Sequence, residues 1–336
     1  MNAQATPAQA AHLQVDYADP AQLQTLLSDP HVLAIFGFKA GADAPPTDDP
    51  RYLQVGLQAE GEAQLEVWRS ASPVSCGRDA NGLAWASDGA LMFGALQVDE
   101  ATHGDIMGAS AHAYAQLMAA LPAHGYPHLL RIWNYMDAIT EGDGDDERYR
   151  HFSIGRARGI GTIDTGTLPA ATAIGRQDGM RILQVYWLAA RTAGTPLENP
   201  RQVSAYRYPR QYGPQSPSFA RALVAAPGSH LPLLLSGTAS VVGHATLHGD
   251  STLRQLQETF NNFEALIGVA RNRMPALPEH FGSGSRLKVY VHDAAEVPAV
   301  REALATHLAA DVPYIVLLAT VCRRDLRIEI DGVHGP

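Results

Sequence analysis

Four arginines stand close together in an otherwise acidic part of the chain. They are Arg148, Arg150, Arg156 and Arg158 in the segment RYRHFSIGRARG, which follows the acidic run EGDGDDE. One interpretation is a set of surface ion pairs with that run, which would contribute little to stability. The other is an anion site, because a planar guanidinium matches a carboxylate and the small residues between the arginines leave room for a ligand. The pattern leaves both interpretations open.

A second possible anion-binding pair lies in the segment QYGPQSPSFARA, which contains Tyr212 and Arg221. A tyrosine hydroxyl together with a guanidinium is a common combination for the carboxylate of a ring compound. Physical arguments alone therefore indicate a protein that binds a small organic anion.

The segment LRIEIDGV near the end of the printed sequence contains a candidate acid. If it forms a strand, one face carries Leu326, Ile328 and Ile330, and the other carries Arg327, Glu329 and Asp331. The ordinary interpretation is a half-exposed strand with a polar outer face. In the functional interpretation Glu329 enters a pocket, where burial would raise its pKa and suit it to general acid catalysis.

Common cofactor and metal motifs are missing from the sequence. It has no P-loop, HExxH or GxSxG, and the glycines of GIGTIDTG and GSGSRL miss the dinucleotide spacing. His244 and His248 stand on a predicted turn without a carboxylate or thiol at ligand spacing, and Cys76 and Cys322 form no zinc or disulfide pattern. We therefore expect neither a metal nor a cofactor.

Composition excludes several classes of protein. The chain has 336 residues, of which 46% are hydrophobic and 18% charged, with a formal net charge of -9. These values are typical of a globular protein and argue against a nucleic-acid or anionic-membrane partner. No secretory signal or membrane-spanning run is recognisable, and with only two cysteines we expect a cytoplasmic location.

The first half of the chain mixes short strands with one clear helix. Strand patterns occur in VLAIFGF, LQVGL, QLEVWRS, LAWASDGALMFGALQV and HLLRIWNYM. A helix is predicted over roughly 105–121, stopped by Pro122 and Gly125. Residues 178–191 fit either a helix or a buried strand. A segment rich in Pro, Gly and Tyr then joins the two halves.

The second half has a more regular pattern. LPLLLSGTASVVGH predicts a strand, a turn and a short strand, and a long helix follows with Asp250 or Ser251 as its cap. RLKVYVHD is a strand, EVPAVREALATHLA is a helix with Pro298 in its first turn, and PYIVLLATVC and DLRIEIDGV are strands. This order predicts an α+β unit in which two helices cover one sheet.

Two resemblances follow from these segments. The second half, through SGTASVVGHATLHGD, TFNNFEALI, RLKVYVHD and RIEIDGV, resembles the YjgF-type imine/enamine deaminases. Over about residues 28–334 the chain resembles the chorismatase family, through GYPHLLRIWNYMDAI, ERYRHFSIGRARG, YGPQSPSFARA, SGTASVVGH and RIEIDG. The resemblance implies an α+β fold of two YjgF-like (chorismate-mutase-like) units with a pseudo-trimer-like core, each unit a mixed sheet covered by helices on one face. It divides the chain into a disordered leader (1–12), a degenerate N-terminal domain (13–195) and a C-terminal domain (196–336).

The chorismatase resemblance also implies a function. Members split chorismate into pyruvate and an aromatic or dihydroxy acid without a cofactor, and this chain is similar to the branch that forms 3-hydroxybenzoate, in some members with 4-hydroxybenzoate. The active site would lie in the C-terminal domain, with arginines reaching it from 148–158. The implied roles are catalytic acid for Glu329, substrate binding for Tyr149, Arg156, Tyr212 and Arg221, and product selectivity for Ala239 and Cys322.

Several questions stay open at this stage. In a flat strand Tyr149 and Arg156 would face opposite ways, unless Gly155 hosts a bulge or the segment is a loop. A YjgF-like deaminase is the first alternative, although the stretch VPYIVLL has Tyr314 near the place where that family needs an arginine. A non-catalytic protein that binds an aromatic acid is the second. We expect a monomer that serves aromatic-acid synthesis, such as a pigment or ubiquinone precursor route.

Overall fold

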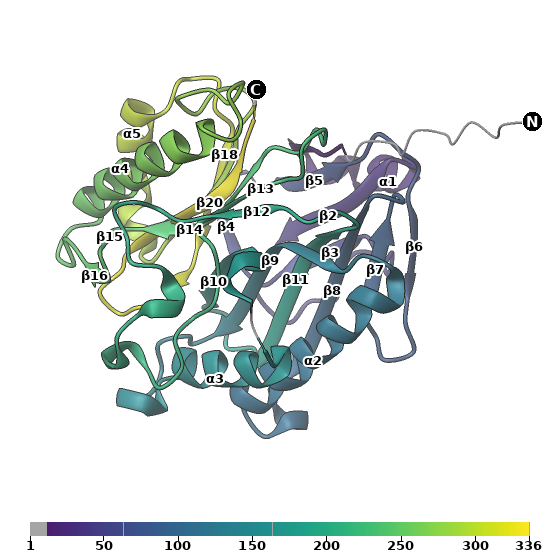
Figure 1. The fold of residues 1–336 in the computed structure, drawn as a ribbon, viewed down its shortest axis with the longest axis horizontal. Helices are drawn as coiled ribbons and strands as arrows, with labels where there is room; N and C mark the ends of the chain where they lie inside the picture. Colours follow the sequence, from purple (N-terminus) through teal and green to yellow (C-terminus); the bar gives the residue numbers. More distant parts are fainter. Residues whose placement is uncertain (1–11, 63, 163, 336) are drawn as a thin grey trace, which may run out of the picture.

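The computed structural model describes residues 12–62, 64–162 and 164–335. Residues 1–11 of the expected leader lie outside the described residues, and His12 forms an isolated bridge with His230. Figure 1 shows two units of sheet and helix, one with α2 and α3 and the other with α4 and α5.

The N-terminal unit is built on a seven-stranded mixed sheet. Helix α2 (Ile106–His124) packs on β8 and β11, and α3 (Arg148–Ile160) packs on α2. The sheet order is β19 (Thr320–Val321), β10 (Ala170–Arg176), β9 (His128–Asp137), β11 (Ile182–Ala190), β8 (Leu91–Asp99), β7 (Ala84–Ser87) and β6 (Ser75–Arg78).

The C-terminal unit is a second seven-stranded mixed sheet, and α4 (Thr252–Arg271) packs on its strands β14 and β20 and against α5 (Val297–His307). Leu287, Val289 and Val291 point into this core, as the alternation of the strand predicts. The order is β12 (Thr195–Leu197), β13 (Ala222–Val224), β14 (Leu233–Ala239), β20 (Ile328–His334), β17 (Arg286–Val291), β18 (Tyr314–Leu318) and β4 (Gln58–Glu60).

A four-stranded sheet closes the core between the two units. Its order is β1 (Gln14–Ala18), β5 (Leu65–Arg69), β2 (Val32–Phe38) and β3 (Tyr52–Val55), with the short helix α1 (Leu23–Ser28) beside it. Aromatic rings of Phe36, Trp68, Phe93 and Trp133 meet there, and their edge-to-face contacts join this sheet to β8 and β9. A two-stranded ribbon, β15 (Val241–Val242) with β16 (Ala245–Thr246), lies at the end of β14.

Each large sheet is completed by a strand from the other half of the chain. β4 pairs with β18 of the C-terminal unit, and β19 pairs with β10 of the N-terminal unit. The segment that follows β19 therefore starts beside the N-terminal unit and returns to the C-terminal sheet as β20. The division of the chain at residue 195 stays a prediction.

The predicted α+β class, with mixed sheets covered by helices on one face, is confirmed. Within residues 178–191, Ile182–Ala190 form strand β11, one of the two structures left open, because both faces of this strand are buried. The helix predicted to stop at Pro122 runs to His124, since a proline in the last turn leaves the preceding turns intact, and Gly125 ends it with φ 80°.

Two further expectations about local structure were wrong. The segment around Tyr149 and Arg156 is neither strand nor loop but helix α3. The segment SGT is not a turn either, because β14 continues through it with a register shift between Leu235 and Thr238. Helix α3 and the irregular part of β14 both contribute residues to the candidate site. Among the described residues no helix has the length and apolar character needed to cross a membrane.

Candidate active site

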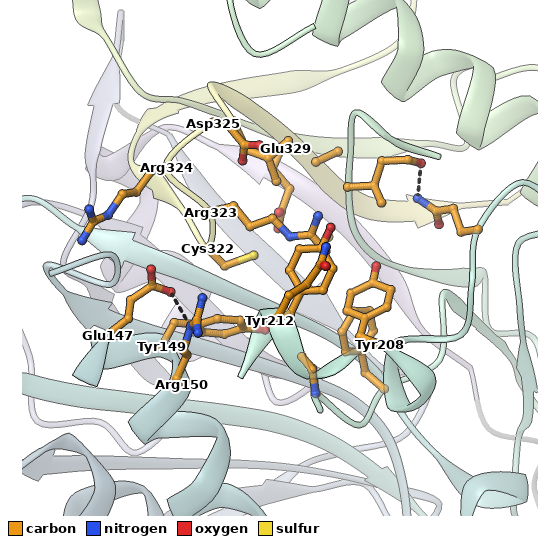
Figure 2. Close-up of a pocket in the computed structure, with 18 of the residues that line it drawn as sticks. Glu147, Tyr149, Arg150, Tyr208, Tyr212, Cys322, Arg323, Arg324, Asp325 and Glu329 are labelled. Carbon is orange, nitrogen blue, oxygen red and sulfur yellow. Dashed lines mark hydrogen bonds and ion pairs between the residues drawn. The ribbon is translucent and has the colours of Figure 1, made fainter. Parts of the chain in front are cut away.

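A cavity of about 400 Å³ lies where the two units meet, and a smaller chamber of about 50 Å³ adjoins it. Figure 2 shows side chains from three distant segments converging on this cavity. They come from the start of α3, the connection between β12 and β13, and the segment from β19 to β20. Both spaces share Tyr149, Phe219, Gly237, Cys322 and Glu329 in their walls.

Glu329 lies on β20, the strand between β14 and β17. Its side chain faces the cavity while Ile328 and Ile330 face the core under α4. The predicted alternation thus holds from Ile328 onward, whereas Leu326 lies before β20 and also lines the cavity. The residue is 5% exposed, which rules out the half-exposed strand. Burial and then the Asp331 charge raise the pKa of Glu329 to about 8, against the opposing effect of nearby arginines. At neutral pH this carboxyl group is a proton donor.

The bulge in β14 makes room for this acid. A Cβ placed on Gly237 would lie 2.0 Å from Oε1 of Glu329 and 2.8 Å from its Cδ. Only glycine allows the carboxyl group to approach the backbone this closely. The register shift in β14 occurs between Leu235 and Thr238, at the same place.

Helix α3 brings Tyr149 and Arg156 to one face. Seven residues correspond to about two helical turns, so the two side chains point the same way without a bulge. Gly155 allows α3 to lie against α2, because an added Cβ would meet Ser110 Oγ at 2.0 Å. Burial, with the charges of Cys322 and Glu329, raises the pKa of Tyr149 well above its usual value, so it contributes a neutral hydroxyl to the cavity.

Two buried arginines provide positive charge at different places. Arg156 lines the small chamber and donates from Nη1 to Ser218 Oγ at 2.7 Å, while Arg221 lines the main cavity and donates from Nη2 to the Tyr208 hydroxyl at 2.7 Å. In both, Nε is buried and has no hydrogen-bond partner among the residues that the structure describes. A buried unpaired N–H is costly, and an anionic ligand would satisfy it.

Sequence reasoning missed Arg323. Its guanidinium lies 4.1 Å from the ring centroid of Tyr212 and 5.1 Å from that of Tyr208, and Nη1 donates to the His244 carbonyl at 2.9 Å. Tyr212 is placed by its hydroxyl, which is 3.2 Å from His244 Nδ1. The sequence signal that could have indicated Arg323 is the pair Arg323 and Arg324, which directly follows Cys322 and ends five residues before Glu329.

The remaining arginines of the original cluster differ in their surroundings. Arg148 pairs with Glu100 at 2.6 Å, and neither Arg148 nor Arg158 lines the cavity. Arg150 lines the main cavity and lies 3.4 Å from Asp145 of the acidic run. Ion pairing with the acidic run is therefore found for Arg150, which also lines the cavity, while the anion-site interpretation stays a prediction.

The two residues expected to influence product choice both line the main cavity. Ala239 is at the end of β14, and Cys322 directly follows β19 and also lines the chamber. Burial, with the neighbouring Glu329 charge, raises the pKa of the Cys322 thiol to about 12. The thiol is therefore a neutral wall of the site and not a nucleophile at neutral pH.

The described residues contain no group of three His, Cys, Asp or Glu side chains placed to hold a metal ion. His244 contacts Tyr212, and His248 lies 3.8 Å from Glu258. The expected absence of a cofactor stays a prediction.

Fold and site together give a cavity and a small chamber that have buried arginines and the buried carboxyl group of Glu329 in their walls. The family model described as "Chorismatase FkbO/Hyg5-like, N-terminal" matches residues 66–189. A chorismatase of Streptomyces hygroscopicus is 35% identical over 289 residues, which is 84% of this chain and 83% of the relative. A 3-hydroxybenzoate synthase of the same species is 35% identical over 301 residues, 86% of this chain and 87% of the relative.

A solved structure agrees with this result. The crystal structure of a chorismatase superposes with a TM-score of 0.87 and 32% identity, covering 98% of this chain and all of that one (100%). A YjgF/YER057c/UK114-family protein from Mycobacterium tuberculosis also matches, over 35% of this chain with a TM-score of 0.26. The chain belongs to the chorismatase family, and the resemblance found from the sequence is confirmed.

Proposed function

We propose that the protein cleaves chorismate to pyruvate and 3-hydroxybenzoate, with 4-hydroxybenzoate as a second product. The observation that carries this proposal is the position of Glu329, a buried proton donor with a pKa of about 8, in a cavity that also contains buried arginines. The relatives named chorismatase and 3-hydroxybenzoate synthase support the same reaction.

The two carboxylates of chorismate require two cationic positions. Arg156 in the small chamber is one, and Arg221 in the main cavity, with Arg323 nearby, is the other. The unpaired Nε–H of Arg156 and of Arg221 are available donors for these carboxylates. Held at both ends, the substrate would present its enolpyruvyl arm to Glu329.

In the proposed reaction Glu329 donates its proton to the methylene carbon of the enolpyruvyl group. The resulting oxocarbenium ion weakens the bond between the ether oxygen and the ring, and pyruvate leaves with that oxygen. The Glu329 carboxylate then takes up the ring proton whose loss makes the ring aromatic. Atoms and electrons balance, and neither water nor a redox cofactor is consumed.

The choice of isomer depends on the oxygen that remains on the ring. The 4-isomer keeps the ring hydroxyl in place. For the 3-isomer, that hydroxyl oxygen bonds to the adjacent carbon, which pyruvate has left, and gives up its proton. The bond to its original carbon then breaks, the oxygen regains a proton, and the adjacent carbon loses its hydrogen as the ring becomes aromatic. Ala239 and Cys322 line the cavity and would limit how the ring settles during this step.

The test is incubation of the purified protein with chorismate. Pyruvate is followed by coupled reduction with lactate dehydrogenase, and the hydroxybenzoate isomers are separated by chromatography. We expect equal amounts of pyruvate and total hydroxybenzoate. Binding of hydroxybenzoate without pyruvate release would indicate the non-catalytic protein, and ammonia release from an imine would indicate the deaminase.

The expected monomer, the cytoplasmic location and the role in aromatic-acid synthesis stay predictions. Sedimentation velocity of the purified chain would test the first of these directly.

A further inference from the structure

A second buried carboxylate lies next to the candidate acid. Asp331 follows Glu329 by two residues on the same face of β20 and is 0% exposed. Its Oδ2 accepts three hydrogen bonds, from Arg131 Nη2 at 2.9 Å, Thr172 Oγ1 at 2.7 Å and the Tyr290 hydroxyl at 3.0 Å. All three donors thus converge on one oxygen of this buried group, whereas Oδ1 has no hydrogen-bond partner among the described residues.

The charges around Asp331 are balanced without Glu329. Arg131 lies 2.9 Å from Asp331, and Lys288 lies 3.6 Å from Asp331 and 3.0 Å from Glu66. This interior therefore contains two cations and two carboxylates, all buried. Ionisation of Glu329 would add a third negative charge beside this buried set, which is unfavourable.

Thr172 lies close to both carboxyl groups. It lines the small chamber, and its Oγ1 lies 3.3 Å from the point where a Cβ on Gly237 would stand, the same point that Glu329 Oε1 approaches within 2.0 Å. The Thr172 hydroxyl donates its only proton to Asp331 and accepts from Arg131 at 2.6 Å. Among the described residues no hydrogen bond joins Thr172 and Glu329, but the Thr172 hydroxyl has a lone pair left for a protonated Glu329 and no proton for an ionised one.

We propose that Asp331, acting by its charge and through the Thr172 hydroxyl, is a positioning residue that keeps Glu329 in the acid form needed for proton transfer. Other titratable or charged groups around Glu329 are Tyr149 and Arg156 of α3, Arg131 of β9, Arg221 before β13, and Cys322 and Arg323 after β19. This role rests on the proposed function, because it concerns the readiness of the acid for chorismate cleavage.

The test is the pH dependence of kcat/KM for pyruvate release in Asp331→Asn. Wild-type activity should fall above about pH 8, where Glu329 ionises. Without the neighbouring charge Glu329 ionises more easily, so the fall should move to lower pH by about one unit, within the range known for close charge pairs. The pH at which activity falls marks the alkaline limb of the profile. An unchanged position of this limb would overturn the proposal.

Glu66→Gln is the matched control. It also neutralises a buried carboxylate that pairs with Lys288, but Glu66 does not line the cavity or contact Thr172. This variant should lose stability without a shift of the alkaline limb. A shift equal to that of Asp331→Asn would mean that any loss of buried charge has the effect, and would overturn the specific role of Asp331.

Asp331→Asn leaves Arg131 without its carboxylate, so the variant can fail to fold. The double variant Asp331→Asn/Arg131→Gln keeps the charge balanced, and because Arg131 opposes the effect of Asp331, its limb should lie between those of the wild type and the single variant. Thr172→Val should shift the limb in the same direction, and Thr172→Ser should restore it. Wild-type limbs in the double variant and in Thr172→Val would reject the proposal.

A measurement without substrate separates this inference from the proposed function. Infrared titration of the ligand-free protein can follow the Glu329 carboxyl band, identified by its loss in Glu329→Gln. Failure to release pyruvate would reject the proposed function alone. An unshifted carboxyl titration in the Asp331 variants would reject the role of Asp331, whatever the substrate.

Discussion

The carboxyl group of Glu329 lies directly over the backbone of Gly237, so close that a Cβ there would be 2.0 Å from Oε1. The two residues belong to neighbouring strands, β20 and β14, at the irregular point of their pairing. The position of the acid is thus determined by the absence of a side chain on the adjacent strand.

Gly237→Ala should therefore lower kcat strongly while leaving the fold intact. The new methyl group must displace the acid, and a displacement of about 1 Å from the reacting carbon can cost roughly 100-fold in rate. Steady-state pyruvate release measures the effect. Gly268→Ala is the control, because a Cβ there would meet nothing within 4 Å in α4, and it should retain wild-type kcat. Equal activity in the two variants would contradict the placement of Glu329.

The buried arginines should affect substrate binding more than the chemical step. Arg156→Lys and Arg221→Lys keep the charge but lose the Nε–H that has no partner among the described residues. Each should raise KM by about 10- to 100-fold, the value of one charge-assisted hydrogen bond. Arg158→Lys, whose side chain does not line the cavity, is the control and should leave KM unchanged. An unchanged KM in both test variants would exclude these arginines from binding.

The raised pKa of Glu329 should also make the free energy of unfolding depend on pH. Its pKa is about 8 in the folded chain against an ordinary value of 4.5, so the unfolded chain loses this proton first as the pH rises. Each pKa unit of difference corresponds to about 1.4 kcal/mol, so the free energy of unfolding falls by several kcal/mol between these two pH values. Glu329→Gln removes the penalty.

Thermal unfolding measured from pH 5 to pH 9 tests this prediction. The Tm of Glu329→Gln should exceed that of the wild type increasingly from pH 5 to pH 8, and the difference should then level off. A constant difference over the whole range would show that Glu329 does not carry the shifted ionisation.

Cys322 should influence which isomer forms and not whether the reaction occurs. Its thiol is neutral and lines both the cavity and the chamber, so Cys322→Ala widens the space around the ring. We expect a changed ratio of 3- to 4-hydroxybenzoate, with the rate of pyruvate release within about tenfold of the wild type. Cys76→Ala, at an exposed position, is the control. An unchanged ratio would reject the selectivity role.

Alternating hydrophobicity was sufficient to predict β17 and β20, including the face on which Glu329 lies. Helix α3 was not predictable in the same way, because its sequence contains Gly155 and Gly159, which lower intrinsic helix propensity. Both glycines are needed by the tertiary structure. An added Cβ would be 2.0 Å from Ser110 Oγ at Gly155 and 2.5 Å from the Ala111 carbonyl oxygen at Gly159. The close packing of α3 on α2 explains this helix, and no local pattern reports it.

The site was predicted in part. Family motifs led to Glu329, Arg156 and Arg221, which line the cavity or its chamber and whose roles stay predictions, whereas the surroundings of Glu329 were not predicted. Arg131 and Asp331 are 200 residues apart in the sequence, and Thr172 and Asp331 are 159 apart. Only the packing of β9 and β10 against the C-terminal sheet brings them together, and no spacing rule within one sequence reports such contacts.

The central claim is that Glu329 donates the proton that starts cleavage of chorismate. The most direct test compares wild type and Glu329→Gln for pyruvate release from chorismate and for hydroxybenzoate binding by calorimetry. The amide preserves the shape but cannot donate an acidic proton, so we predict a loss of turnover of about 100- to 10,000-fold with binding essentially retained. Near-normal pyruvate release by Glu329→Gln would contradict the account.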